Sequence, residues 1–189
     1  MSDDFAWPEQ QPILGDGRLT LRPWNADDAD CVFRACQDAD IQRYTTVPVP
    51  YLREHAEGFV VAAPAKYRLR EAAGFAIATT ATGQVVGSCG LGPVNLVDRT
   101  SGGGYWVAPW GRGRGVAASA LDILTTWALD PRRLRRIQME IEPENAASVA
   151  AAVRAGYVRM NVPPLMELHR GEVRPFDLYE KTAEKTAER

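Results

Sequence analysis

The alternation of hydrophobic and polar residues along the chain predicts an α+β fold. The clearest strand is 136–142, where Ile137, Met139 and Ile141 fall on one face and polar residues on the other. The clearest helix is 116–129, which is rich in alanine and leucine and stops before an Asp-Pro pair. Similar patterns predict further strands over 19–24, 75–80, 85–91, 104–107, 165–168 and 175–181, and further helices over 26–37, 52–61 and 146–155.

The order of these elements indicates how they connect. Turns join the strands over 75–80, 85–91 and 104–107, so an antiparallel meander is expected there. The segment 41–50 is rich in proline and threonine and is predicted to be a loop. With 189 residues, 46% of them hydrophobic, the chain is long enough to bury one good core. We therefore expect a single domain over 1–189, with a core at about 17–182 and short flexible termini.

A glycine-rich turn between the predicted strand 104–107 and the predicted helix 116–129 carries the strongest chemical signal. Glycine alternates with arginine along this turn, soon after a proline ends the strand. Side chains at Gly111, Gly113 and Gly115 would obstruct an approaching diphosphate, whereas glycine leaves main-chain N–H groups accessible. The first turn of the following helix adds unpaired N–H groups and the positive end of the helix dipole. The turn therefore predicts a phosphate-binding site.

Three kinds of phosphate-binding loop fit this turn to different degrees. A P-loop is excluded because Gly115 is followed by valine and alanine instead of lysine and a hydroxyl residue. A dinucleotide-binding fingerprint, G-x-G-x-x-A, matches 113–118, and Glu140 and Glu142 follow on the next predicted strand. Its glycines normally follow the strand directly, however, and only about seventy residues remain to complete such a domain. The third pattern, R-x-x-G-x-A, is filled by 112–117.

This third pattern resembles the pyrophosphate loop of the GNAT N-acetyltransferase superfamily, and two other motifs support the resemblance. The sequence R-L-T-L-R-P-W at 18–24 resembles the opening strand of the ribosomal-protein N-terminal (alanine) acetyltransferase branch. The branch's P-x-N-x-x-S element is similar to 143–148, and Gly156 and Tyr157 follow where its G-F pair closes the next helix. The motifs span about 17–182. The resemblance implies a GNAT-like acyl-CoA N-acyltransferase fold, with a mostly antiparallel sheet splayed at the cofactor site and flanked by helices.

The resemblance also implies acetyl-CoA as the cosubstrate. Its diphosphate would lie on the glycine-rich turn, while main-chain groups of the strand ending at Val107 pair with the pantetheine amides. A main-chain N–H near Val107 would polarise the thioester carbonyl. The cofactor-binding residues that the resemblance implies are Trp106, Val107, Arg112, Gly113, Arg114, Gly115, Val116, Ala117 and Asn145.

The departing thiolate needs a stabilising or protonating group. Many enzymes of the superfamily carry a tyrosine seven residues after the motif's asparagine, but this chain has Ala152 there. The resemblance instead implies that the Ser148 hydroxyl stabilises or protonates the sulfur, while Asn145 holds the cofactor arm. In the alternative interpretation, Asn145 and Ser148 only cap the helix 146–155, and the two roles are compatible.

The acceptor amine must lose a proton, and carboxylates are candidates for the base. The resemblance points to Glu167, which stands four residues before Gly171, with Glu142 and water as alternatives. Because an α-amine has a pKa of about 8, part of it is already neutral near pH 7, and a weak base is enough to remove the proton from the rest. The segment 41–51, a connection between two predicted helices, is expected to select the acceptor, because loops vary without disturbing a scaffold.

Composition and charge exclude several other classes of protein. The net charge is −2, and no apolar run approaches the roughly 20 residues that span a bilayer. Three cysteines without C-x-x-C spacing suit a reducing compartment and are expected to pack in the core, and two isolated histidines predict no metal site. Arginines at 132, 133, 135 and 136 lack an aromatic stacking platform, so no direct nucleic-acid binding is expected. The chain is predicted to be cytoplasmic, without membrane association.

These observations together predict an acetyl-CoA-dependent N-acetyltransferase. It would move the acetyl group to a primary amine by direct transfer in a ternary complex, as a monomer or homodimer. The acceptor would be a peptide N-terminus or a small-molecule amine. One alternative is a catalytically degenerate acyl-CoA-binding sensor or scaffold, which the missing tyrosine permits and which Ser148 and Glu167 argue against. The other alternative is a dinucleotide-binding oxidoreductase.

Overall fold

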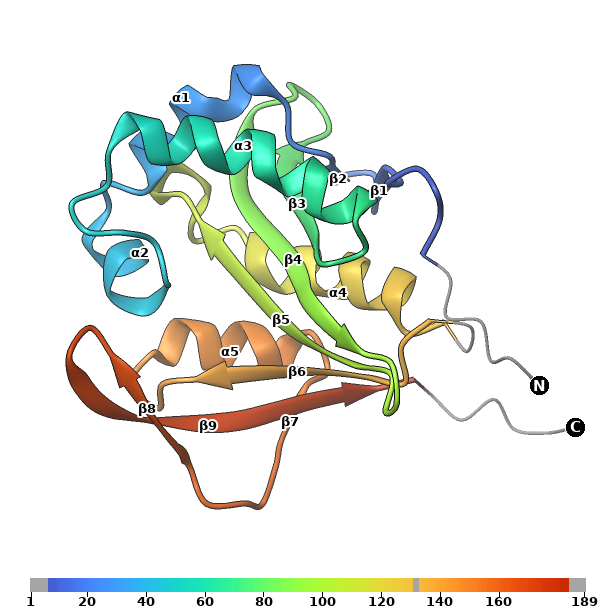
Figure 1. Ribbon diagram of the computed structural model, residues 1–189, viewed down its shortest axis with the longest axis vertical. Coiled ribbons are helices and arrows are strands. Elements are labelled where there is room, and N and C mark those ends of the chain that lie inside the picture. Colours follow the sequence, from blue (N-terminus) through green and yellow to red (C-terminus); the bar gives the residue numbers. More distant parts are fainter. Residues whose placement is uncertain (1–6, 131–132, 184–189) are drawn as a thin grey trace, which may run out of the picture.

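The computed structural model describes residues 7–130 and 133–183 and contains a nine-stranded mixed sheet flanked by helices (Figure 1). The strands are β1 (Leu14–Gly15), β2 (Leu19–Arg22), β3 (Ala73–Thr79), β4 (Val85–Asn95), β5 (Thr100–Val107), β6 (Arg136–Ile141), β7 (Val158–Arg159), β8 (Leu165–His169) and β9 (Glu172–Thr182). The helices are α1 (Ala29–Ala35), α2 (Ala39–Tyr44), α3 (Arg53–Arg68), α4 (Val116–Ala128) and α5 (Ala146–Arg154), with short 3₁₀ turns η1 (Ala26–Asp28) and η2 (Pro109–Gly111).

The strand order explains where the sheet opens. Neighbouring strands follow the order β1-β2-β3-β4-β5-β6-β9-β7, and β8 pairs with β9. The pairs along β1 to β5 are antiparallel, so the predicted meander is confirmed. Strands β5 and β6 are parallel and pair over 100–102 and 136–138, after which they diverge (Figure 1). The predicted α+β class and the splayed, mostly antiparallel sheet are confirmed.

Each diverging strand keeps a partner on its outer edge. The end of β5 pairs with β4, where Val107 lies opposite Gly87, and the end of β6 pairs with β9, where Ile141 lies opposite Asp177. Past the short parallel register, the inner edges of β5 and β6 therefore have main-chain groups that do not pair across the sheet. Such groups need other hydrogen-bond partners, such as water or a ligand.

Two clusters of buried side chains hold the sheet between its helices. On β3, Phe75 and Ile77 point to the cluster that contains Leu121 and Leu124 of α4. The intervening Ala76 points to the other cluster, which packs beneath α1 and α3. This alternation of large and small side chains lets helices pack closely on both faces. Burial of these side chains stabilises the strands that carry the site.

The structure differs from the sequence-based expectation mainly at α2. The segment 41–50 was expected to be a loop, but its first residues belong to this helix. Asp38 begins the helix, because its side chain accepts hydrogen bonds from the N–H groups of Asp40 and Ile41 at 3.1 and 3.0 Å. Ile41 is then buried at 4% exposure, which anchors so short a helix. The sequence signal that could have predicted this helix is the aspartate N-cap at position 38.

Other boundaries moved by smaller amounts. Helix α3 runs seven residues beyond the expected end at 61, and β9 begins at Glu172 instead of 175. The two-residue strands β1 and β7 were not expected, because so short a segment has no readable periodicity. The cysteines Cys36 and Cys89 are buried, as expected, and Cys31 is half-buried. Arg132 of the arginine cluster and the termini at 1–6 and 184–189 lie outside the described residues.

Candidate active site

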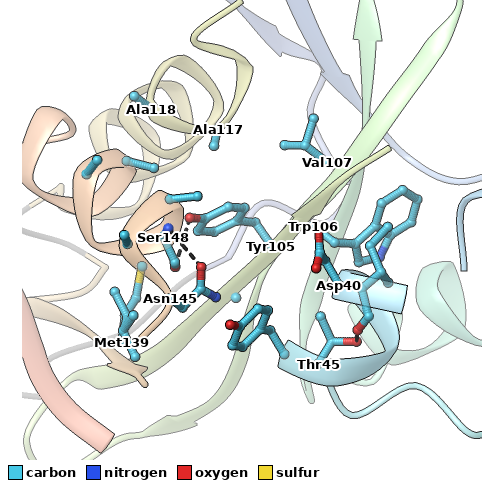
Figure 2. Close-up of a pocket in the computed structure, with 18 of the residues that line it drawn as sticks. Asp40, Thr45, Tyr105, Trp106, Val107, Ala117, Ala118, Met139, Asn145 and Ser148 are labelled. Carbon is cyan, nitrogen blue, oxygen red and sulfur yellow. Dashed lines mark hydrogen bonds between the residues drawn. The ribbon is translucent and has the colours of Figure 1, made fainter. Parts of the chain in front are cut away.

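A cavity of about 710 Å³ lies where β5 and β6 diverge. Its walls come from the ends of these two strands, the glycine-rich turn, and the first turns of α4 and α5. Helix α2 supplies the opposite wall, through residues that include Asp40 and Ile41, and Thr45 follows directly after it (Figure 2). The cavity therefore extends from the glycine-rich turn to α2.

The glycine-rich turn forms a cradle at the start of α4. Gly113 and Gly115 have φ angles of +75° and +69°, a left-handed conformation that glycine adopts without strain. A Cβ atom at either position would project into open space, with no atom within 4 Å. No side chain of the described residues caps α4, so the N–H groups of its first turn need another partner, and Val116 and Ala117 of this turn line the cavity. These features fit a bound diphosphate.

Gly111 has a different role from the one expected. A Cβ atom there would lie 2.9 Å from the Cβ and carbonyl oxygen of Val86. Glycine is required because the turn packs tightly against β4, whether or not a ligand approaches at this position. The indole N–H of the neighbouring Trp110 donates to the carbonyl of Val85 at 3.0 Å, which fixes the turn on the same strand.

The two arginines of the turn have different surroundings. The Arg112 guanidinium contacts Asp38 at 2.5 Å and Asp40 at 3.3 Å, both at the start of α2. Burial acts to raise the pKa of Asp38, but the hydrogen bonds from Arg112 and from main-chain N–H groups outweigh it and lower that pKa. Arg114 is exposed, and its carbonyl accepts a hydrogen bond from Arg18 at 2.7 Å. The side chain of Arg112 therefore links the turn to α2.

Successive side chains of β5 point to opposite faces of the sheet. Trp106 packs its ring against Trp24, with centroids 6.3 Å apart, in the cluster beneath α1 and α3. Tyr105 and Val107 alternate with it and lie on the cavity side (Figure 2). Trp106 can therefore offer a ligand its main chain, and its role in binding the cofactor stays a prediction.

The start of α5 brings three polar groups together. The Asn145 side chain accepts a hydrogen bond from the Ser148 N–H at 3.1 Å, so Asn145 is the N-cap. The Ser148 hydroxyl takes no part in this cap. Its oxygen instead accepts a hydrogen bond from the Tyr105 hydroxyl at 2.9 Å, as the dashed lines in Figure 2 show. Burial raises the pKa of Tyr105, although the bond to Ser148 opposes this, so the phenol keeps its proton near neutral pH.

Three carboxylates lie at the β6 side of the site. Glu142 is 6% exposed and accepts a hydrogen bond from Arg174 at 3.0 Å. Glu140 also lines the cavity, and burial, followed by the neighbouring Glu167, raises its pKa. Glu167 is exposed on β8 and, among the described residues, is a neighbour of the lining and not part of it. The role of Glu167 as a base thus stays a prediction.

The turn between β8 and β9 reaches across to the segment after α2. His169 Nε2 donates to the carbonyl of Arg43 at 2.9 Å. The Arg170 guanidinium donates to the carbonyls of Thr45 at 3.1 Å and Val47 at 2.7 Å. We call these three contacts the hairpin bridge. The bridge fixes α2 relative to β8 and β9 beside the cavity.

Within 7–130 and 133–183, no group of three or more histidine, cysteine, aspartate or glutamate side chains is arranged to hold a metal ion. None of the helices in the same residues combines the length and the apolar character needed to cross a bilayer.

Comparison with known proteins gives a consistent result. A family model described as an acetyltransferase (GNAT) domain matches residues 18–158. Over 166 residues the chain is 25% identical to the uncharacterized N-acetyltransferase p20 of Bacillus licheniformis, covering 86% of this chain and 90% of p20.

Solved structures of low sequence identity share the fold. RimL, a ribosomal L7/L12 alpha-N-protein acetyltransferase in complex with coenzyme A, is 18% identical, with a TM-score of 0.81 over 90% of this chain and 98% of RimL. MccE, the microcin C7 self-immunity acetyltransferase in complex with acetyl-CoA and AMP, is 17% identical, with a TM-score of 0.80 over 88% of this chain and 93% of MccE.

Proposed function

The chain belongs to the GNAT acetyltransferase family, and on this basis we propose that it moves an acetyl group from acetyl-CoA to a primary amine by direct transfer in a ternary complex. The observation that carries the proposal is the cavity between β5 and β6. It joins a phosphate cradle at Gly113 and Gly115 to an acceptor side at α2, with Tyr105 and Ser148 between them. The complexes of RimL with coenzyme A and of MccE with acetyl-CoA support the choice of cosubstrate.

Residues of this chain would hold acetyl-CoA through its phosphates and its amides. The left-handed glycines and the start of α4 suit the diphosphate. The inner edge of β5, from Gly103 to Val107, suits the pantetheine amides, because its main-chain groups need partners. When bound, the thioester supplies an acetyl carbon that an amine can attack. An N–H near Val107 would then stabilise the charge that develops on the acetyl oxygen.

The acceptor would enter at the side lined by α2 and β6. Asp40, Tyr44, Glu140 and Glu142 line this part of the cavity. The names of the related structures point in two directions, since RimL is named for a ribosomal protein and MccE was solved with AMP. We therefore propose a peptide N-terminus or a small-molecule amine as the acceptor.

A screen of acceptor amines tests the proposal. Purified protein is incubated with acetyl-CoA and panels of peptides and small amines, and the release of free thiol is followed. We expect thiol release that requires both protein and amine, together with a product heavier by one acetyl group. Binding of acetyl-CoA without turnover on any amine would favour the acyl-CoA-binding sensor instead.

Acceptor choice is expected to depend on 41–51. A graft of the same length from a relative, retaining the buried Ile41 and Tyr51, should change which amines are acetylated, because this segment supplies Tyr44 and Thr45 to the cavity. The dissociation constant of acetyl-CoA, measured by calorimetry, should change less than about threefold, since the phosphate cradle is untouched. An unchanged order of preference across the amine panel would contradict this role.

Glu167→Gln is expected to lower turnover in a pH-dependent way. The variant keeps the shape of the side chain and removes a base beside the cavity lining. Because an amine of pKa about 8 is mostly protonated at low pH, the loss should be about tenfold near pH 6 and small above pH 9. A pH-rate profile measures this, with Glu57→Gln on the exposed side of α3 as the control. A loss of equal size at every pH would exclude Glu167 as the base.

A further inference from the structure

A hydrogen bond between Tyr105 and Ser148 connects β5 with α5 at the cavity. Tyr105 lies on β5 and Ser148 lies in the first turn of α5, so the bond joins the two sides of the cleft (Figure 2). Both residues line the cavity, and the donor-acceptor distance is 2.9 Å. The two residues are 43 positions apart in the sequence, so this contact is a product of the fold.

The direction of this bond determines what Ser148 can offer a ligand. The Ser148 hydroxyl oxygen accepts a hydrogen bond from the Tyr105 hydroxyl, and the Ser148 N–H donates one to the Asn145 side chain. Within the described residues, no acceptor takes the Ser148 hydroxyl proton, which is therefore available to the cavity. A hydroxyl that accepts one hydrogen bond also becomes a stronger donor of another, because the bonds polarise each other.

A side chain at position 152 of the same helix cannot donate a hydrogen bond into the cavity. Ala152 has an exposed fraction of 0% and packs in the core cluster with α4. A tyrosine side chain there would meet the core and not the cavity. The tyrosine hydroxyl at this site comes from β5 instead.

We propose that Tyr105 is a positioning residue for acetyl transfer, which fixes the Ser148 hydroxyl so that its proton points to the departing sulfur. This inference rests on the proposed function. The amine nitrogen forms the new N–C bond with its lone pair as the C–S bond breaks, and the electron pair of that bond goes to sulfur. The proton lost by the nitrogen goes to a base or water. The thiolate accepts a hydrogen bond from Ser148 and takes its own proton from water.

The thiol of bound coenzyme A provides a test that needs no acceptor. If Ser148 donates to the thiolate, the thiol titrates at a lower pH when bound than when free, and ultraviolet absorbance of the thiolate reports this. Ser148→Ala should raise the midpoint of the bound thiol by about one pH unit, and Tyr105→Phe by about half a unit. The double variant should match Ser148→Ala, because Tyr105 acts through Ser148.

Turnover and a matched control complete the test. Tyr105→Phe should reduce kcat about threefold, with the dissociation constant of acetyl-CoA unchanged. Tyr157→Phe is the control, because it also removes a buried tyrosine hydroxyl, one that has no hydrogen-bond partner within the described residues. The control should leave both the thiol midpoint and kcat as in the parent protein.

The possible outcomes separate this inference from the proposed function. A lowered thiol midpoint that depends on Tyr105 supports the inference even if no amine is acetylated, in which case the proposed function is wrong. Acetylation of amines with a midpoint and kcat that do not respond to Tyr105→Phe overturns the inference alone. Additive effects in the double variant would overturn it as well, since Tyr105 would then act independently of Ser148. Failure of coenzyme A to bind would overturn both.

Discussion

Gly115→Asp is expected to weaken acetyl-CoA binding by at least about a hundredfold, which corresponds to roughly 3 kcal/mol. Gly115 has a φ of +69°, and a side chain there would project into the open space where we place the diphosphate. An aspartate adds bulk and a negative charge at the end of the helix that would attract the phosphates. Isothermal titration calorimetry with acetyl-CoA measures the loss.

A second glycine provides the control for strain. Gly83, in the turn between β3 and β4, has a φ of +70° and equally open surroundings. Gly83→Asp therefore carries the same conformational cost, about 1 to 2 kcal/mol at most, but lies away from the cradle. It should bind acetyl-CoA like the parent protein. Parental affinity in Gly115→Asp, or binding of NADH in place of acetyl-CoA, would show that the assignment of the turn is wrong.

Ser148→Ala is expected to reduce kcat by about ten- to a hundredfold while acetyl-CoA binding changes little. A hydrogen bond to a charged partner contributes about 1.5 to 3 kcal/mol, and here it forms mainly as the thiolate departs. The fold should be kept, because α5 is capped through the Ser148 N–H, which alanine retains. Steady-state kinetics and calorimetry on the same protein separate the two effects.

The control for this change removes a helix serine outside the cavity. The Ser119 hydroxyl on α4 donates to Asp16 at 2.5 Å and is not part of the cavity lining in the described residues. Ser119→Ala should keep the parental kcat. A matching decrease in both variants would indicate a general loss of stability, and parental turnover in Ser148→Ala would show that water and main-chain groups assist the thiolate instead.

Features that depend on neighbouring residues could be predicted from the sequence. The turn at 111–115 and the Asn145 cap follow from local composition, and both are present. The motifs at 18–24, 112–117 and 143–148 together led to the family, which the family model confirms. The splayed sheet followed from that resemblance, since periodicity alone gives no strand order.

Contacts between distant segments could not be predicted. The pairing of Arg112 with Asp38 joins residues 74 positions apart, and the motif gave no sign of this partner on α2. Tyr105 and Val107 are two residues apart in a strand, a spacing that places both on one face of the sheet. Neither pattern identifies a partner on another element, because that depends on how the whole sheet diverges.

The hairpin bridge has a consequence for how the acceptor side can change over evolutionary time. His169 and Arg170 donate to the carbonyls of Arg43, Thr45 and Val47, and every amino acid has such a carbonyl. Because Thr45 also lines the cavity, a substitution there would alter a side chain of the cavity wall while leaving the main-chain contact with Arg170 in place. The proposed acceptor wall can therefore change at this position without losing that anchoring contact.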